Sequence, residues 1–168
     1  KPMDWLEHAL KHNVEGIVSA EELKNKIKLG KQLRIKFGVD VTNPLIHIGH
    51  GVNLWKMREF QDHGHKVVFL IGDFTTLIGD PTGKSKTRPV RSSEEVEKDA
   101  QTYIDQVTKI LLKDSQVFEV RRNSEWYSKM LIGEFLNLCS KITHAKLIQR
   151  DMFQKRIAEG SEIFLHEM

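Results

Sequence analysis

Two short stretches of this chain gather side chains that could hold a nucleotide triphosphate. The first is residues 40–50, DVTNPLIHIGH, and the second is residues 72–89, GDFTTLIGDPTGKSKTRP. Each follows an apolar run typical of a buried strand, and each combines hydroxyl, imidazole or cationic donors with glycine and proline. Donors of these kinds suit nucleotide phosphates, so the two stretches indicate chemistry on ATP.

The paired histidines are the clearest chemical feature of the first stretch. His47 and His50 lie three residues apart at the predicted start of a helix, so both project from one helix face. A helix N-terminus offers free N–H groups and partial positive charge, which favour phosphate. Gly49 would let a flat ring lie against the backbone, and Thr42 adds a hydroxyl donor. An H-x-G-H pattern can be incidental, but its place directly after a strand favours a phosphate site.

The second stretch offers one acidic and two basic candidates. Asp80 lies in a Gly-Asp-Pro turn, where it could serve as a turn cap or bind a cation such as an ammonium group. Lys84 and Arg88 could hold the outer phosphates of a nucleotide, or could be solvated surface charges. Residues 79–85 are not a P-loop, because three rather than four residues separate the glycines and Pro81 removes an amide donor.

Hydrophobic periodicity predicts an α/β fold, a Rossmann-like nucleotide-binding domain in which helices flank an incomplete parallel sheet. Strands are expected at residues 33–39, 66–72 and 116–120. Helices are expected at residues 3–12, 20–29, 47–62 and 92–112, with continuous helix over 124–159 and a functional loop over 74–91. Two capping boxes should open helices, Ser19 with Glu22 and Ser92 with Glu95.

Size and composition limit the classes of protein to consider. The 168 residues correspond to one domain, and 39% hydrophobic with 29% charged residues excludes a disordered chain. No apolar run approaches the ~20 residues of a membrane helix. The single cysteine, Cys139, excludes an internal disulfide, is expected to be buried and points to a cytoplasmic protein. A net charge of +3 permits a nucleic-acid partner without arguing for one.

Because the sequence starts at Lys1 and stops inside the apolar segment 164–168, we expect a piece of a larger protein.

These motifs resemble those of one enzyme family. The tetrapeptide HIGH at residues 47–50 resembles the signature of class I aminoacyl-tRNA synthetases. IGDPTGKSKTRP after FLIGDFT resembles the tyrosyl-tRNA synthetases of the bacterial type. The similarity continues through NSEW at 123–126, QRDMF at 149–153 and the pair HE at 166–167.

The resemblance implies a tyrosine–tRNA ligase, in which ATP activates L-tyrosine to tyrosyl-adenylate and the tyrosyl group then passes to tRNA(Tyr). ATP would be a substrate, and Mg2+ would bridge its phosphates with few dedicated protein ligands, so no protein metal site is expected. The family implies a helical N-terminal extension (1–32), the first half of a Rossmann-like catalytic domain (33–123) and a helical connective insertion (124–168) that forms a homodimer. A chain holding only this part is expected to have weak activity or none.

On the ATP side, the resemblance implies that Thr42 and His47 hold the γ-phosphate as pyrophosphate forms. Lys84 and Arg88 match basic residues of a loop that closes on the leaving group. The residues implied to be catalytic are Thr42, His47, His50, Lys84 and Arg88. The residues implied to line the ATP site, with Gly49 and His50 beside the ribose and adenine, are Gly38, Asp40, His47, Gly49, His50 and Asn53.

On the tyrosine side, Asp80 matches the aspartate that binds the substrate ammonium, with Thr75 beside it. The residues implied to contact tyrosine are Lys36, Asp40, Leu70, Thr75 and Asp80. This chain departs from the family at Lys36, where some relatives place a tyrosine that meets the substrate hydroxyl. It departs also at Val41, where proline is usual, and the KMSKS signature is absent from residues 1–168.

Other interpretations fit parts of the sequence. An H-x-G-H nucleotidyltransferase would share the paired histidines and the ATP chemistry, but it does not account for residues 73–89. A non-catalytic synthetase-derived module that binds RNA or a partner protein would not need all five side chains named as catalytic. The apolar residues of the 124–159 region favour ordinary core by pattern alone, whereas the resemblance favours a dimer interface; they are Leu131, Ile132, Phe135, Leu138 and Ile142.

Overall fold

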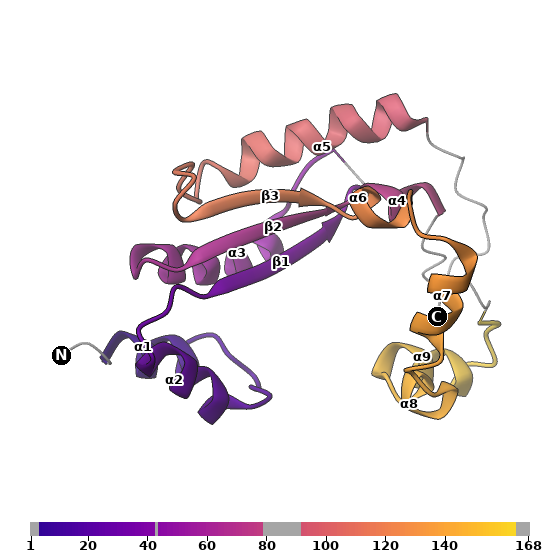
Figure 1. Ribbon diagram of the computed structural model, residues 1–168, viewed down its shortest axis with the longest axis horizontal. Helices are drawn as coiled ribbons and strands as arrows, with labels where there is room; N and C mark the ends of the chain where they lie inside the picture. Colours follow the sequence, from indigo (N-terminus) through magenta and orange to yellow (C-terminus); the bar gives the residue numbers. More distant parts are fainter. Residues whose placement is uncertain (1–3, 43, 79–91, 164–168) are drawn as a thin grey trace.

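The computed structural model describes residues 4–42, 44–78 and 92–163, which are arranged around one parallel sheet (Figure 1). The strands are β1 (Arg34–Asp40), β2 (Lys66–Gly72) and β3 (Phe118–Arg122), in the order β1-β2-β3. Their parallel register places Asp40 opposite Gly72 and Ile71 opposite Arg122. The carboxyl ends of the three strands therefore meet at one edge of the sheet, which confirms the predicted Rossmann-like architecture.

Two crossover helices cover a single face of this sheet. α3 (Ile48–Asp62) connects β1 to β2, and α5 (Ser93–Val107) precedes β3. The strand residues of the core occupy alternate positions, so they point to one face, where both helices pack. The core and the residues packed against it include Phe37, Val39, Leu54, Val67, Phe69, Ile71, Ala100, Tyr103, Val107, Leu111, Phe118 and Val120. On the opposite face, the β1 side chains Arg34, Lys36 and Asp40 are exposed.

The N-terminal helices α1 (Asp4–Lys11) and α2 (Ala20–Lys28) lie near the amino ends of the strands (Figure 1). α1 is fastened to the last turns of α3. The Trp5 ring stacks on His63 with centroids 4.0 Å apart, and Lys56 Nζ donates to the Ala9 carbonyl at 2.8 Å. Leu6 and Ala9 are buried in this contact region, so the helix predicted at residues 3–12 is present as α1 and is docked by its apolar face.

One of the two predicted capping boxes is wrong. Ser19, before α2, has a left-handed backbone with φ of 62° and makes no side-chain capping bond. A capping serine needs an extended backbone to aim its hydroxyl at the helix amides, so the pairing with Glu22 does not form. At α5 the prediction is confirmed, because Glu95 N donates to Ser92 Oγ at 3.2 Å and Ser92 N donates to Glu95 Oε2 at 2.9 Å.

Two element boundaries differ from the prediction as well. α5 ends at Val107 rather than at residue 112, and the Leu112 N–H donates to the Gln61 side chain at 2.9 Å instead of continuing the helix. β3 begins two residues later than predicted, because the Asp114 carbonyl accepts the Phe118 N–H in a turn at 2.8 Å. In both places a tertiary or turn hydrogen bond replaces the partner that the regular element would supply.

Short helices form the carboxyl side of the described chain: α4 (Asp73–Ile78), α6 (Ser124–Tyr127), α7 (Ile132–Cys139), α8 (His144–Ile148) and α9 (Asp151–Ala158). The loop predicted over 74–91 is wrong in its first part, where α4 forms, and residues 79–91 lie outside the described residues.

The prediction of one continuous helix over 124–159 is also wrong. Thr143 caps a new helix there, with its Oγ1 accepting from Lys146 N at 3.3 Å.

The helices α7 to α9 lie beyond the carboxyl ends of the strands (Figure 1). α7 has no buried residue, and Cys139 is exposed, which contradicts the expected buried thiol. The interpretation of the apolar residues in and beside α7 as ordinary core, which the pattern alone favoured, is likewise wrong, because they remain exposed by 42–80%: Leu131, Ile132, Phe135, Leu136, Leu138 and Ile142. Along residues 4–42, 44–78 and 92–163, no helix is both long and apolar enough to cross a bilayer.

His65, just before β2, should make stability depend on pH. Its Nδ1 accepts the Leu33 N–H at 3.3 Å, and its Nε2 is buried without a hydrogen-bond partner in the described structure. Burial, and then the nearby His63, lowers the pKa of His65. The folded state therefore binds a proton less readily than the unfolded state. Stability is complete above the unfolded-state pKa of about 6.5 and falls as the pH drops below it.

We expect the urea midpoint of the full-length protein to fall between pH 7.5 and 5.5, because protonation removes the acceptor of the partly buried Leu33 N–H, a loss of about 1 kcal/mol. His65→Asn keeps an acceptor near the Nδ1 position but cannot be protonated, so it should reduce this fall. His144→Asn, at an exposed residue, is the matched control. An equal fall in His65→Asn and the unmutated protein would contradict the assignment.

Candidate active site

The two histidines of the first motif cap the helix that they begin. His47 precedes α3 with an extended backbone, and its Nδ1 accepts from Gly49 N at 3.2 Å. His50 Nδ1 accepts in turn from His47 N at 3.2 Å, and the two ring centroids are 4.1 Å apart. The predicted helix start is thus confirmed, and the histidines satisfy two N–H groups at this terminus.

This cap determines the tautomer of both rings. Because each Nδ1 receives a backbone N–H, each neutral imidazole carries its proton on Nε2. Burial, and then the neighbouring His47, lowers the pKa of His50, so His50 is neutral at pH 7 and keeps its acceptor. Two Nε2–H donors therefore stand at the first turn of a 15-residue helix, where partial positive charge favours an anion.

Gly49 makes room for one of these rings. A Cβ at this position would lie 3.0 Å from both Cε1 and Nδ1 of His47. The sequence predicts that a flat ring could lie against the backbone here, and the ring found in this place is the imidazole of His47 itself. A side chain at Gly49 would crowd that imidazole, which would have to shift slightly from its capping position.

Asp40 and Thr75 form an acidic site at the ends of β1 and β2. Thr75 Oγ1 donates to Asp40 Oδ1 at 2.8 Å. Gly72, opposite Asp40 in the sheet, leaves space for this bond, since a Cβ there would lie 2.0 Å from Asp40 Oδ1 and 2.7 Å from Thr75 Oγ1. The structure thus brings together two of the residues predicted to contact the amino acid.

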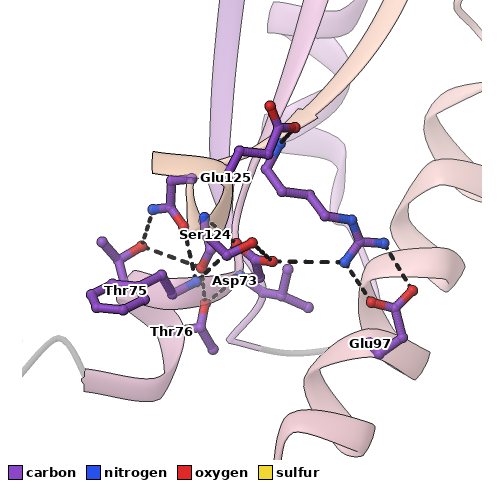
Figure 2. A network of polar contacts seen from close by, with 11 residues as sticks. Asp73, Thr75, Thr76, Glu97, Ser124 and Glu125 are labelled. Carbon is purple, nitrogen blue, oxygen red and sulfur yellow. Dashed lines mark hydrogen bonds and ion pairs between the residues drawn. The ribbon is translucent and has the colours of Figure 1, made fainter. Parts of the chain in front are cut away.

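A partly buried polar network supports this acidic site from α4, β3 and α6 (Figure 2). Asn123 Nδ2 donates to Thr75 Oγ1 at 2.9 Å, and Ser124 Oγ donates to Asp73 Oδ2 at 2.6 Å. Thr76 Oγ1 donates to the Gly72 carbonyl at 2.6 Å and accepts from Val41 N at 3.0 Å. The sequence motifs assign no role to Asp73, Asn123 or Ser124, although their place directly after strands in a doubly wound fold is a signal for one.

The open face of the sheet holds three more of the predicted residues. Lys36 extends over Gly38, because a Cβ at Gly38 would lie 2.9 Å from Lys36 Cε and 3.0 Å from its Nζ. Leu70 pairs with Gly38 across the two strands and is partly buried. Lys36, Gly38 and Leu70 therefore form one surface beside the Asp40–Thr75 pair.

The remaining predicted residues divide into two groups. Thr42 and Asn53 are exposed, Thr42 two residues after the end of β1 and Asn53 one turn after His50 on α3. Asp80, Lys84 and Arg88 lie outside the described residues. In the part of the chain that is described, no three histidine, cysteine or acidic side chains cluster in a way that could hold a metal ion.

Comparison with known proteins shows which proteins are related to this chain. The chain is 48% identical to a tyrosine–tRNA ligase of Deinococcus radiodurans over 159 residues, which are 95% of this chain and 39% of that protein. It is 48% identical to a tyrosine–tRNA ligase of Francisella tularensis over 158 residues, 94% of this chain and 39% of that protein. The chain thus spans about two fifths of the length of these curated relatives.

The fold agrees with these relatives. The crystal structure of a C-terminally truncated Coccidioides posadasii mitochondrial tyrosyl-tRNA synthetase is 25% identical, with a TM-score of 0.71 over 99% of this chain and 47% of that one. The model of the family described as tRNA synthetases class I (W and Y) matches residues 6–168. This chain therefore belongs to the class I tRNA synthetase family of the tryptophan and tyrosine type.

Proposed function

We propose that this chain is the nucleotide-binding half of the catalytic domain of a tyrosine–tRNA ligase. The full-length protein would activate L-tyrosine with ATP to tyrosyl-adenylate and transfer the tyrosyl group to tRNA(Tyr). The observation that carries the proposal is the pair of Nδ1 caps at the start of α3, which leave an Nε2–H donor on each histidine, on the connection that leaves β1 at the Asp40 carboxylate. The names of the 48% identical relatives support tyrosine as the amino acid.

The proposed reaction needs charge stabilisation more than proton transfer. The tyrosine carboxylate is ionised at neutral pH, so it can attack the α-phosphorus without a general base, and the bond from that phosphorus to the pyrophosphate oxygen breaks. Catalysis then rests on in-line positioning and on donors placed where charge develops. His47, His50 and Thr42 would supply these donors, and Lys84 and Arg88 would add positive charge to the leaving group. ATP would bring Mg2+ on its phosphate oxygens, a mode that needs few protein ligands.

We place the amino acid along the open face of β1. Its ammonium would lie at Asp40 and Thr75, with Asp80 as a further carboxylate, and its ring would lie over Leu70. Strand residues rise about 3.3 Å each, so the Cα atoms of residues 36 and 40 are about 13 Å apart. Because the Lys36 side chain extends over Gly38, its ammonium lies closer to residue 40 than the Lys36 Cα does. Lys36 would then face the phenol oxygen, where some relatives carry a tyrosine.

The direct test is pyrophosphate exchange into ATP by the full-length protein. We expect exchange that depends on tyrosine and not on tryptophan or phenylalanine. Exchange driven by tryptophan would reassign the amino acid within the same family. Release of pyrophosphate with a nucleotide acceptor and no amino acid would favour the H-x-G-H nucleotidyltransferase. ATP binding without any exchange would leave the module that binds RNA or a partner protein as the better interpretation.

A homodimer is part of the proposal. α7 presents large apolar side chains at both i and i+4, with Ile132 exposed by 80% and Leu136 by 61%. Exposed apolar area of this extent is typical of an interaction surface. We infer that the 124–168 segment meets its counterpart in a second copy, as the family resemblance implies.

We expect the full-length protein to be a dimer by light scattering and the double variant Ile132→Asp/Leu136→Asp to be a monomer, because two charges cannot be buried unpaired in an apolar interface. Asn137→Asp adds one charge to another face of the same helix and should remain dimeric. An unmutated protein that scatters as a monomer, or a double variant that stays dimeric, would remove α7 from the interface.

A further inference from the structure

Residues 123–126, NSEW, follow β3 and are joined to the start of α4 by hydrogen bonds between Asp73 and Ser124 (Figure 2). We call this pair of residues the clamp. Asp73, the first residue of α4, accepts three hydrogen bonds: from Ser124 Oγ at 2.6 Å, from Ser124 N at 3.0 Å and from its neighbour Phe74 N at 2.9 Å. The Asp73 side chain is only 14% exposed. A buried carboxylate that accepts several N–H and O–H groups is firmly oriented, so Asp73 and Ser124 connect the ends of β2 and β3.

An ion pair supports the clamp from α5. Arg122 makes two bonds to the Glu97 carboxylate, at 2.5 and 2.8 Å, and its Nη1 lies 3.8 Å from Asp73 Oδ2. The guanidinium thus partly balances the clamp's negative charge while Glu97 holds the guanidinium. On the apolar side, the Phe74 ring stacks on Tyr127 of α6 with centroids 5.3 Å apart.

The clamp fixes Asn123, which stands between it and the acidic site. Asn123 is 6% exposed, its Oδ1 accepts from Phe74 N at 2.9 Å, and its Nδ2 donates to Thr75 Oγ1 at 2.9 Å. Both groups of this amide are therefore used, and its orientation follows from its partners. Because Thr75 Oγ1 receives this proton, it must direct its own proton to another acceptor.

Two acceptors compete for the Thr75 proton. Asp40 Oδ1 lies at 2.8 Å, whereas the Gly72 carbonyl lies at 3.2 Å and already accepts Thr76 Oγ1 at 2.6 Å. The shorter, charge-assisted bond to Asp40 is favoured. The hydrogen bonds therefore run in one direction, from Asn123 through Thr75 to Asp40, and they hold Asp40 Oδ1 while Oδ2 has no partner within the described ranges.

We propose that Asp73 and Ser124 are positioning residues for amino-acid affinity. By fixing Asn123 and through it Thr75, they hold the Asp40 carboxylate with one oxygen turned to a cationic group of the substrate. This inference rests on the proposed function, because it takes the amino-acid ammonium as the partner of Asp40. It extends that function to residues that do not touch the substrate.

The test compares Ser124→Ala and Asp73→Asn with the unmutated full-length protein by pyrophosphate exchange, varying tyrosine and ATP separately. Each variant loses a hydrogen bond to a charged group, so we expect the KM for tyrosine to rise about tenfold, with the KM for ATP unchanged. Ser124→Thr keeps the hydroxyl and should restore the tyrosine KM. Asp62→Asn, whose carboxylate accepts from Arg58 on the exposed side of α3, is the matched control.

The outcomes separate the two proposals. A lowered unfolding midpoint in both variants with an unchanged tyrosine KM would overturn the inference and leave a purely structural clamp. An equal rise of both KM values would overturn it as well, because the effect would not be specific to the amino acid. Absence of tyrosine-dependent exchange in the unmutated protein would instead overturn the proposed function, and this inference with it.

Discussion

Gly72→Ala in the full-length protein should raise the KM for tyrosine by about 10- to 100-fold, the cost of disturbing one charged hydrogen-bond partner. The new Cβ would lie 2.0 Å from Asp40 Oδ1 and 2.7 Å from Thr75 Oγ1, so the two groups cannot keep their 2.8 Å bond. Gly72 is buried in the middle strand and paired with Asp40, so the backbone has little room to yield. Overpacking of this kind costs about 1–3 kcal/mol of stability.

Steady-state pyrophosphate exchange at saturating ATP measures the KM for tyrosine, and urea unfolding measures the loss of stability. Gly16→Ala is the control, because a Cβ at that position, outside the proposed dimer segment, meets no atom within 4 Å. It should leave both KM values unchanged and should not lower stability, since alanine loses less conformational freedom on folding than glycine. A Gly72→Ala protein that is destabilised but binds tyrosine normally would place the Asp40–Thr75 pair outside the substrate site.

His47→Ala should lower kcat by about 10²- to 10³-fold, the usual effect of removing one donor to charge that develops in the transition state. The same change removes the acceptor of the Gly49 N–H, so it combines a catalytic loss with a capping loss. His47→Asn separates the two, because its amide oxygen can occupy the Nδ1 position and keep the cap while the Nε2–H donor is lost. We therefore expect His47→Asn to be stable and still slow.

His47→Gln provides the complementary variant, since its amide nitrogen can reach the Nε2 position. Part of the lost rate should return in this variant, measured as single-turnover formation of tyrosyl-adenylate. Full activity in His47→Asn would show that the cap alone matters and that the imidazole does not donate to phosphate. A rise in the KM for ATP with unchanged kcat would assign His47 to ground-state binding instead.

Several elements followed directly from local patterns. The largely apolar run at residues 66–72 predicted β2 to the residue, because a central strand of a parallel sheet is apolar at most of its positions. α3 begins where the histidine motif predicted, and α5 begins at the Ser92–Glu95 box, because caps are local hydrogen bonds between residues three apart.

Predictions failed where the pattern missed a local change of backbone conformation, or where burial depends on another element. The pattern over residues 124–159 is compatible with continuous helix, but Thr143 caps a separate helix and the chain turns there. Cys139 and the apolar residues of α7 looked like core, yet they are exposed, since burial depends on which element packs over a residue and not on its own type. The box at Ser19 failed because the backbone there is left-handed.

By itself, the sequence determined the parallel α/β architecture, and it predicted a candidate site after the strands together with the chemical types of its donors. Predictions of this kind depend on hydrophobic periodicity, on the spacing of motif residues and on side-chain chemistry, which are local properties of the sequence. Only the tertiary structure decided that Asp73 meets Ser124, 51 residues later, and that Asn123 reaches Thr75, 48 residues earlier. Such contacts form only once the strand ends stand side by side in the sheet, and no local pattern encodes them because the partners lie about fifty residues apart.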